Sequence, residues 1–192
     1  LIARQPDFGT AMLFPPVFLG MAFLAGARIR NLLLLCLAGA CVLGAAWFTP
    51  GVLKDYQKQR LLSFIQPEKY PHTSASYNAR QATLALCSGG WYGRGWGQGR
   101  LNQLGRIPER HTDFILPVIA EEWGFVRTAG VVGGFIVLFL LVGRIAWVSR
   151  DAFGRLLAGG VLCLLSTQAL LHVAISVRLA PITGLTLPLV SY

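Results

Sequence analysis

Four long apolar stretches constrain this chain more than any other feature. They lie, in chain order, at residues 11–27, 32–49, 114–145 and 156–177. Even the shortest would reach about 25 Å as a helix, which is just enough to cross the core of a bilayer. Only 13% of all residues are charged, whereas a soluble globular domain carries about 25%. We therefore predict an all-α membrane protein, a polytopic helical bundle with four spans in a single membrane domain.

A long loop separates the second stretch from the third. Residues 50–113 hold nine Lys or Arg against four acids, a net charge of +5. We expect short interfacial helices within it, at 54–65 and at 77–86. Its glycine-rich run, residues 88–99, lacks the strand and helix that flank a dinucleotide-binding loop. The run instead predicts a tight turn whose aromatic residues lie at the lipid headgroups. After the last stretch, the tail is too rich in Pro and Gly for a regular helix.

The short loops predict the orientation. Arg28 and Arg30 follow the first stretch, and a basic turn from Arg144 to Arg155 follows the third. Because short basic loops stay in the cytoplasm, the long loop is expected outside the cell. Both ends of the sequence resemble cuts within a longer protein, since it begins at Leu1 without a methionine or a signal-peptide pattern and stops at Tyr192 just after an apolar L-P-L-V.

A cluster of ionisable residues stands where the long loop meets the third stretch. Ionisable groups beside hydrocarbon are costly, so several at one boundary indicate a functional site. Two interpretations of Asp113 stay open at this point: it is a reactive carboxylate, or Thr112 or Asp113 simply caps the following helix. Glu121 and Glu122 lie deeper and need a partner, for which Arg127 is a candidate. The cluster itself consists of Arg106, Glu109, Arg110, His111 and Asp113.

Two residue types inside the apolar stretches have simple structural explanations. His172 has no second metal ligand at helical spacing, which favours a hydrogen-bonded interior histidine over a metal site. The four cysteines show no paired spacing. We therefore expect them to be small buried hydrophobic residues rather than a disulfide or zinc framework.

Several motifs closely resemble the SEDS family of membrane glycosyltransferases. The resemblance extends along nearly the whole chain in the family's order, with one departure at residues 70–77. The P-E-R-H-T-D-F form favours the RodA (elongation) branch over the FtsW (division) branch. The matching motifs are Q-P-D-F-G-T at 5–10, D-Y-Q-K-Q-R at 55–60, S-G-G at 88–90, P-E-R-H-T-D-F-I at 108–115, A-E-E-W-G at 120–124, F-G-R-L-L-A-G-G at 153–160 and P-I-T-G-L-T-L-P-L-V-S-Y at 181–192.

The resemblance implies a ten-span peptidoglycan polymerase that joins lipid II units outside the bacterial cytoplasmic membrane. The family's aspartate matches Asp113, which would take the proton of the attacking sugar hydroxyl. Arg106, Arg110 or a divalent cation such as Mg or Mn would stabilise the departing pyrophosphate. No other cofactor is implied. Substrate contacts are expected from Asp7, Arg106, Glu109, Arg110, His111 and Glu121.

The resemblance also implies a partner, a class B penicillin-binding protein whose transpeptidase crosslinks the glycan product. Two other functions fit a membrane protein with these charged residues. A flippase for lipid-linked precursors would also need a basic cleft and charges within spans. A non-catalytic scaffold that recruits the transpeptidase would keep the spans without needing Asp113.

Overall fold

The computed structural model describes residues 8–49, 58, 62–65, 74–99 and 113–191. Within these residues, regular secondary structure is helical and no strand forms, so the all-α prediction is confirmed. The long helices are α1 (Phe8–Leu24), α2 (Ile29–Phe48), α4 (Ser74–Ser88), α6 (Ile115–Val148) and α7 (Ala152–Ser176).

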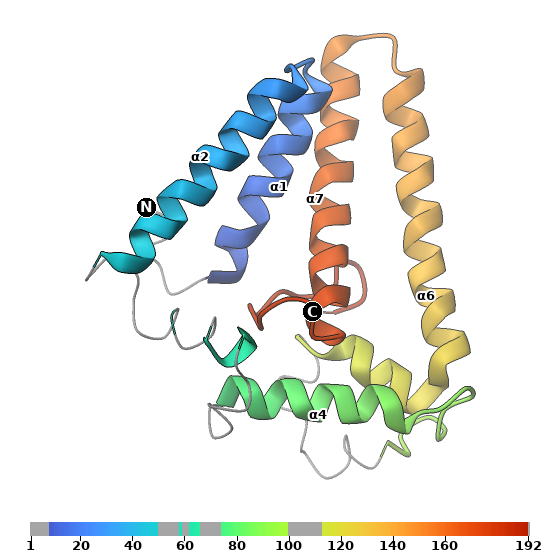
Figure 1. Ribbon diagram of the computed structural model, residues 1–192. Coiled ribbons are helices and arrows are strands. Elements are labelled where there is room, and N and C mark those ends of the chain that lie inside the picture. The colour runs from blue at the N-terminus through green and yellow to red at the C-terminus, as the bar shows by residue number, and fades with distance from the viewer. Residues whose placement is uncertain (1–7, 50–57, 59–61, 66–73, 100–112, 192) are drawn as a thin grey trace.

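Four of these helices run alongside one another, and α4 crosses below them (Figure 1). Helix α7 occupies the middle, with α1 on one side and α6 on the other, and α2 contacts α1. Helix α4 packs on the first part of α6 and on the end of α7. Helix α4 includes residues 77–86, so the short helix expected there is confirmed. The arrangement therefore brings the start of α6 and the end of α7 together above α4.

The helices follow the four apolar stretches closely. Two of them, α6 and α7, are long and apolar enough to cross a membrane. Helices α1 and α2 contain shorter apolar segments, Gly9–Leu24 and Ile29–Val42. Helix α1 continues through its paired prolines. Four membrane crossings in this chain stay a prediction.

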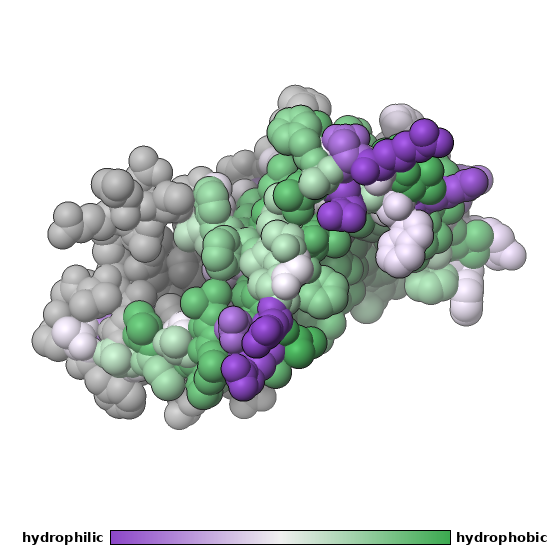
Figure 2. Space-filling view, turned by 90° about the horizontal axis from the view of Figure 1, so that it is seen from above, coloured by the Kyte–Doolittle hydropathy of each residue, from purple (hydrophilic) through white to green (hydrophobic). Residues whose placement is uncertain are grey.

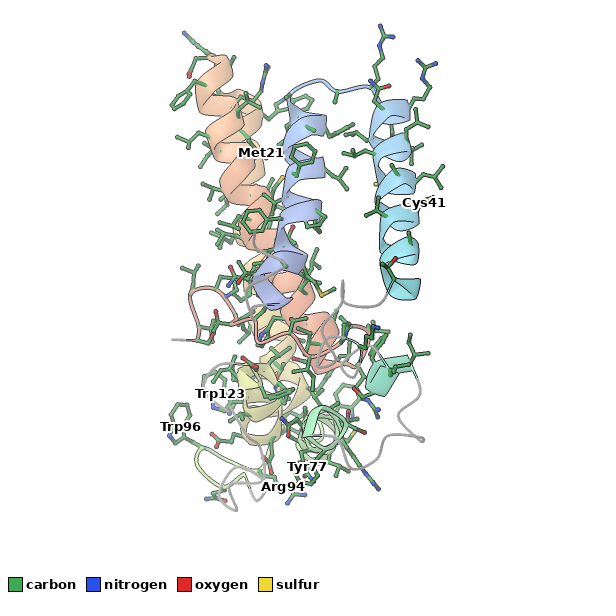
Figure 3. The ribbon with its side chains drawn as sticks, turned by 90° about the vertical axis from the view of Figure 1, so that its left-hand side faces the viewer. Met21, Cys41, Tyr77, Arg94, Trp96 and Trp123 are labelled. Carbon is green, nitrogen blue, oxygen red and sulfur yellow. The ribbon has the colours of Figure 1, made fainter. Side chains whose placement is uncertain are left out.

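Small residues let α1 approach α7 closely. A side chain at Gly159 would collide with Leu24, and one at Gly160 would lie 3.2 Å from the sulfur of Met21. Met21 lies on the α7-facing part of α1 in Figure 3. Small residues allow close backbone approach between membrane helices, where packing rather than the hydrophobic effect drives association.

The cysteines are free, as expected, but the expectation that they are buried is wrong for three of them. Cys36 and Cys41 are exposed on α2, and Cys87 is exposed at the end of α4. Helix α2 packs mainly on α1, and most of its described side chains are exposed (Figure 3). Cys163 is half-buried because it packs against Gly20.

Helix α6 is broken at Gly124, whose backbone is not helical (φ 80°, ψ 176°). In a continuous helix each amide bonds the carbonyl four residues earlier. The break therefore releases the amides of Phe125 and Val126 and the carbonyls of Glu121 and Glu122. Unbonded backbone groups are costly in apolar surroundings, so other groups must replace these bonds.

The glycine-rich loop after α4 supplies all four replacement bonds. Two of its amides donate to α6 carbonyls, and two of its carbonyls accept from α6 amides. The bonds are Arg94 N to Glu121 O (3.1 Å), Gly95 N to Glu122 O (3.0 Å), Phe125 N to Gly90 O (2.9 Å) and Val126 N to Trp91 O (3.2 Å). The loop thus takes the place of one turn of α6.

The close approach of loop and helix explains why glycines are needed. A side chain at Gly93 would collide with the Glu122 carbonyl, and one at Gly124 would collide with the amide of Gly93. Both glycines also have a positive φ. Next to this contact, the rings of Trp96 and Trp123 lie 5.6 Å apart (Figure 3). The tight aromatic turn expected from the sequence is therefore confirmed, and it binds helix backbone.

This geometry predicts that Gly124→Ala strongly destabilises the full-length protein. The backbone conformation at Gly124 is available almost only to glycine and costs other residues about 1–3 kcal/mol. The collision with Gly93 adds to that cost. The measurement is the thermal unfolding midpoint of the detergent-purified protein, which we expect to fall by several degrees.

Gly130→Ala is the matched control in the same helix. A side chain at Gly130 meets nothing within 4 Å. Alanine is favoured over glycine inside a helix by about 0.5–1 kcal/mol, so this variant should unfold at the wild-type temperature or above it. Equal midpoints for the two variants would contradict the inferred role of the break.

Candidate functional site

Asp113 lies half-buried in the turn that leads into α6. Helix α6 begins at Ile115 and its N-cap position is taken by Phe114. The N-cap position therefore lies one residue after Asp113, and the other capping candidate, Thr112, lies outside the described residues.

The residue after Asp113 anchors the turn in the protein core. Phe114 is 1% exposed and packs with Ala82 and Ala85 of α4 and with Ile175 of α7. The two alanines leave room for the ring because they are small. The backbone at Asp113 is thus fixed at the junction of α4, α6 and α7.

The chain after α7 passes beside Asp113 as an extended tail. Residues 181–187 form neither helix nor strand, as the sequence predicted. Alternate members are buried, namely Pro181, Thr183, Leu185 and Leu187. This period of two is that of an extended chain with one face covered.

Gly184 brings the tail next to the carboxylate. It has a positive φ of 79° and faces away from the buried side of the tail. A side-chain carbon built there would lie 3.7 Å from Oδ2 of Asp113. The Asp113 carboxylate therefore lies beside the tail, with room for no more than a small side chain between them, although α6 and α7 separate the two along the chain.

Side chains of α7 hold the tail in place. His172 Nδ1 lies 2.9 Å from the carbonyl oxygen of Leu185, and the amide of Gln168 donates to the carbonyl of Thr186 at 3.0 Å. On the other side, Gly9 of α1 packs directly against the backbone of Thr183. His172 is fully buried, so the expectation of a hydrogen-bonded interior histidine is confirmed.

The two deeper carboxylates lie on the first part of α6. Glu121 is 0% exposed and Glu122 is 8% exposed. Their backbone carbonyls bind the glycine-rich loop, as described above. The expected pairing with Arg127 is wrong, because Arg127 is exposed beyond the break and forms no ion pair with any residue the structure describes. Gly124 turns the helix between them.

Of the site residues expected from the sequence, the described part of the chain contains Asp113 and Glu121. The others, Asp7, Arg106, Glu109, Arg110 and His111, lie outside the described residues. Within the residues that the structure describes, no three His, Cys, Asp or Glu side chains gather as they would around a metal ion. The roles assigned to these residues stay predictions.

Two parts of this site were not foreseen. Gly184 and Gly9 contact it through backbone that carries no reactive group, so their chemistry gave no signal. The spacing of Gln168 and His172 did carry one, because residues four apart share one face of a helix. Two polar residues on one face of an apolar helix indicate a buried polar partner, here the carbonyls of the tail.

Comparisons with known proteins agree with this architecture. A family model described as the cell cycle proteins FtsW, RodA and SpoVE matches residues 1–192. The peptidoglycan glycosyltransferase MrdB of Escherichia coli strain K12 is 37% identical over 195 residues, which cover 100% of this chain and 51% of that protein. The probable peptidoglycan glycosyltransferase FtsW of Nitrosococcus halophilus is 38% identical, over 100% of this chain and 49% of the relative.

A solved structure is similar as well. One chain from a study of structural coordination of polymerization and crosslinking by a peptidoglycan synthase complex superimposes with a TM-score of 0.79 at 31% identity. The match covers 100% of this chain and 51% of that one, so the chain spans about half the length of the relatives it matches. Relatives of the MrdB and FtsW types match about equally well, so the elongation branch stays a prediction. The chain is a membrane protein of the FtsW/RodA/SpoVE family, as its motifs suggested.

Proposed function

We propose that this chain is part of a peptidoglycan glycosyltransferase that polymerises lipid II outside the cytoplasmic membrane. The observation that carries the proposal is Asp113, a carboxylate next to the buried Phe114 and beside the tail at Gly184. The chain that surrounds Asp113 is similar over its whole length to proteins named for this activity. A crosslinking transpeptidase is the corresponding partner, since the similar structure comes from a complex that couples polymerization to crosslinking.

Asp113 is assigned the role of general base. It accepts the proton of the attacking sugar hydroxyl while that oxygen forms a bond to the anomeric carbon of the other sugar. The bond from the same carbon to the lipid pyrophosphate breaks, and the pyrophosphate leaves with the bonding electron pair. Pyrophosphate is a good leaving group, so one carboxylate suffices where glycosidases use two. Cationic groups of the +5 loop, Arg106 and Arg110 among them, would neutralise the leaving group.

An apolar surface begins beside Asp113 and fits the lipid part of such a substrate. A cavity of about 170 Å³ lies between α6 and α7, and all its lining residues are apolar. Two of them adjoin the site, Leu116 in the first turn of α6 and Leu187 at the end of the extended tail. A polyprenyl chain needs an apolar neighbour of this kind next to the charged reaction centre.

The basic turns support the outward orientation of Asp113. The α1–α2 turn and the α6–α7 turn lie at the end of the bundle opposite α4 (Figure 1). Seen from above, hydrophilic side chains gather there in separate groups on a largely hydrophobic face (Figure 2). The exposed arginines of these turns are Arg28, Arg30, Arg144, Arg150 and Arg155. The positive-inside rule assigns that end to the cytoplasm.

Single-cysteine labelling tests this orientation. In full-length protein without its native cysteines, Ser74→Cys at the start of α4 should react with a membrane-impermeant reagent in intact cells. Ser149→Cys, in the α6–α7 turn, should react only after the cells are opened. The reverse pattern would place Asp113 in the cytoplasm and contradict the proposed reaction outside it.

Replacing the carboxylate tests the proposed chemistry. Asp113→Asn keeps the shape of the side chain but cannot accept a proton, and loss of general-base catalysis costs about 10²–10⁴-fold in rate. We expect normal expression, normal binding of the transpeptidase and near-complete loss of glycan strands. The measurement is gel-resolved polymerisation of labelled lipid II by the detergent-purified full-length protein.

Asp151→Asn is the matched control, with the same substitution at the opposite end of the bundle. Asp151 caps α7 by accepting a hydrogen bond from the amide of Gly154, and asparagine caps as well as aspartate. This variant should polymerise at the wild-type rate. Wild-type activity of Asp113→Asn would instead favour a flippase or a scaffold.

A further inference from the structure

His172 stands out as a polar side chain inside an apolar helix. It is completely buried, and the hydroxyl of Ser176, one turn later, bonds its backbone carbonyl. A buried polar group without a hydrogen bond is costly, and polar residues within membrane helices usually have a function. The contacts of the His172 ring therefore indicate what this residue does in α7.

The hydrogen bond to the tail defines the state of the ring. The oxygen of Leu185 can only accept, so Nδ1 of His172 carries the proton and donates it across 2.9 Å. Nε2 is then an acceptor, and it has no partner among the residues that the structure describes. The bond to Leu185 is thus the ring's principal anchor.

Gln168 adds a second anchor one turn earlier. It lies four residues before His172, on the same face of α7, and its amide donates to the carbonyl of Thr186. Two neighbouring carbonyls of the tail, at 185 and 186, are therefore held by one helix face. An extended segment without helix or strand pairing depends on such side-chain anchors for its position.

The anchored segment is the one that borders the reactive carboxylate. Gly184 directly precedes Leu185, and a side-chain carbon built on it would lie 3.7 Å from Oδ2 of Asp113. We propose that His172 is a positioning residue for glycan synthesis, which holds the Leu185 carbonyl and so fixes the tail against the Asp113 carboxylate. This inference rests on the proposed function of Asp113. It explains why a fully buried side chain would affect the reaction.

The physical reason is the sensitivity of catalysis to geometry. A displacement of about 1 Å in a reacting group can lower the rate on the order of 10²-fold. Without its anchor the tail could move away, and Asp113 would lose the surface that limits its rotamers. Substrate binding elsewhere would be unaffected, so kcat would fall while KM stays close to the wild-type value.

Two substitutions separate this role from others. His172→Asn places an amide donor where Nδ1 stands and removes Nε2. His172→Leu keeps a similar volume and removes the donor. In full-length protein we expect kcat for lipid II polymerisation to fall roughly 10–100-fold in the leucine variant. The asparagine variant should stay within about threefold of the wild type, since it keeps the donor.

Hydrogen–deuterium exchange gives a readout independent of activity. Peptides covering residues 181–191 should exchange faster in His172→Leu and at the wild-type rate in both His172→Asn and Asp113→Asn. If His172→Leu does not accumulate, Gln168→Leu replaces it, because Gln168 is only partly buried and its loss frees the neighbouring carbonyl. That variant should show the same pattern with a smaller loss of kcat.

Each remaining outcome overturns one specific statement. Faster exchange with an unchanged kcat would show that the anchor does not position the reaction. An inactive His172→Asn with normal exchange would show that Nε2 takes part directly. If Asp113→Asn is inactive while His172→Leu is normal in both readouts, the positioning role alone fails. If Asp113→Asn is active, the proposed function fails, whatever the histidine variants do.

Discussion

The need to bond every backbone group in apolar surroundings explains the central feature of this structure. A broken membrane helix is stable only where other groups replace its missing hydrogen bonds. In α6 the glycine-rich loop provides those bonds, two to each side of Gly124. The loop and the break are therefore one structural unit. A change in either would leave donors or acceptors unbonded in the other.

This unit determines where the candidate site lies. Because α6 turns at Gly124, its first part packs on α4 while the longer second part continues beside α7 (Figure 1). An unbroken helix of 34 residues would extend about 50 Å and carry Asp113 away from the tail. The break instead brings Phe114 into the core with Ile175. The chemistry proposed at Asp113 thus depends on the backbone contact at Gly124, eleven residues further along the chain.

Periodicity and composition predicted the helices well, because apolar stretches of this length have few alternatives. They could not predict the break. The residues A-E-E-W-G stand inside the predicted span, and glycine alone does not show that a loop from a distant segment replaces helix bonds. The same limit applies to Arg127, which is close to Glu121 in the sequence but is separated from it by the turn at Gly124. Asp113 was identified as a candidate base because its motif carries recognisable chemistry, whereas Gly184 and Gly9, which adjoin the carboxylate and the tail, carry no reactive group.

The surroundings of Asp113 combine three segments that are distant in sequence. The turn before α6 supplies the carboxylate, the tail supplies the surface at Gly184, and α1 closes the other side of the tail through Gly9. These three segments meet through close packing, because Gly9 adjoins the backbone of Thr183 and Phe114 lies in the core with Ile175. A carboxylate that is to act as a base must be placed within reach of the proton it accepts. If Asp113 has that role, the packing of these segments sets its position, and a shift of any one of them would change the geometry of the proposed reaction.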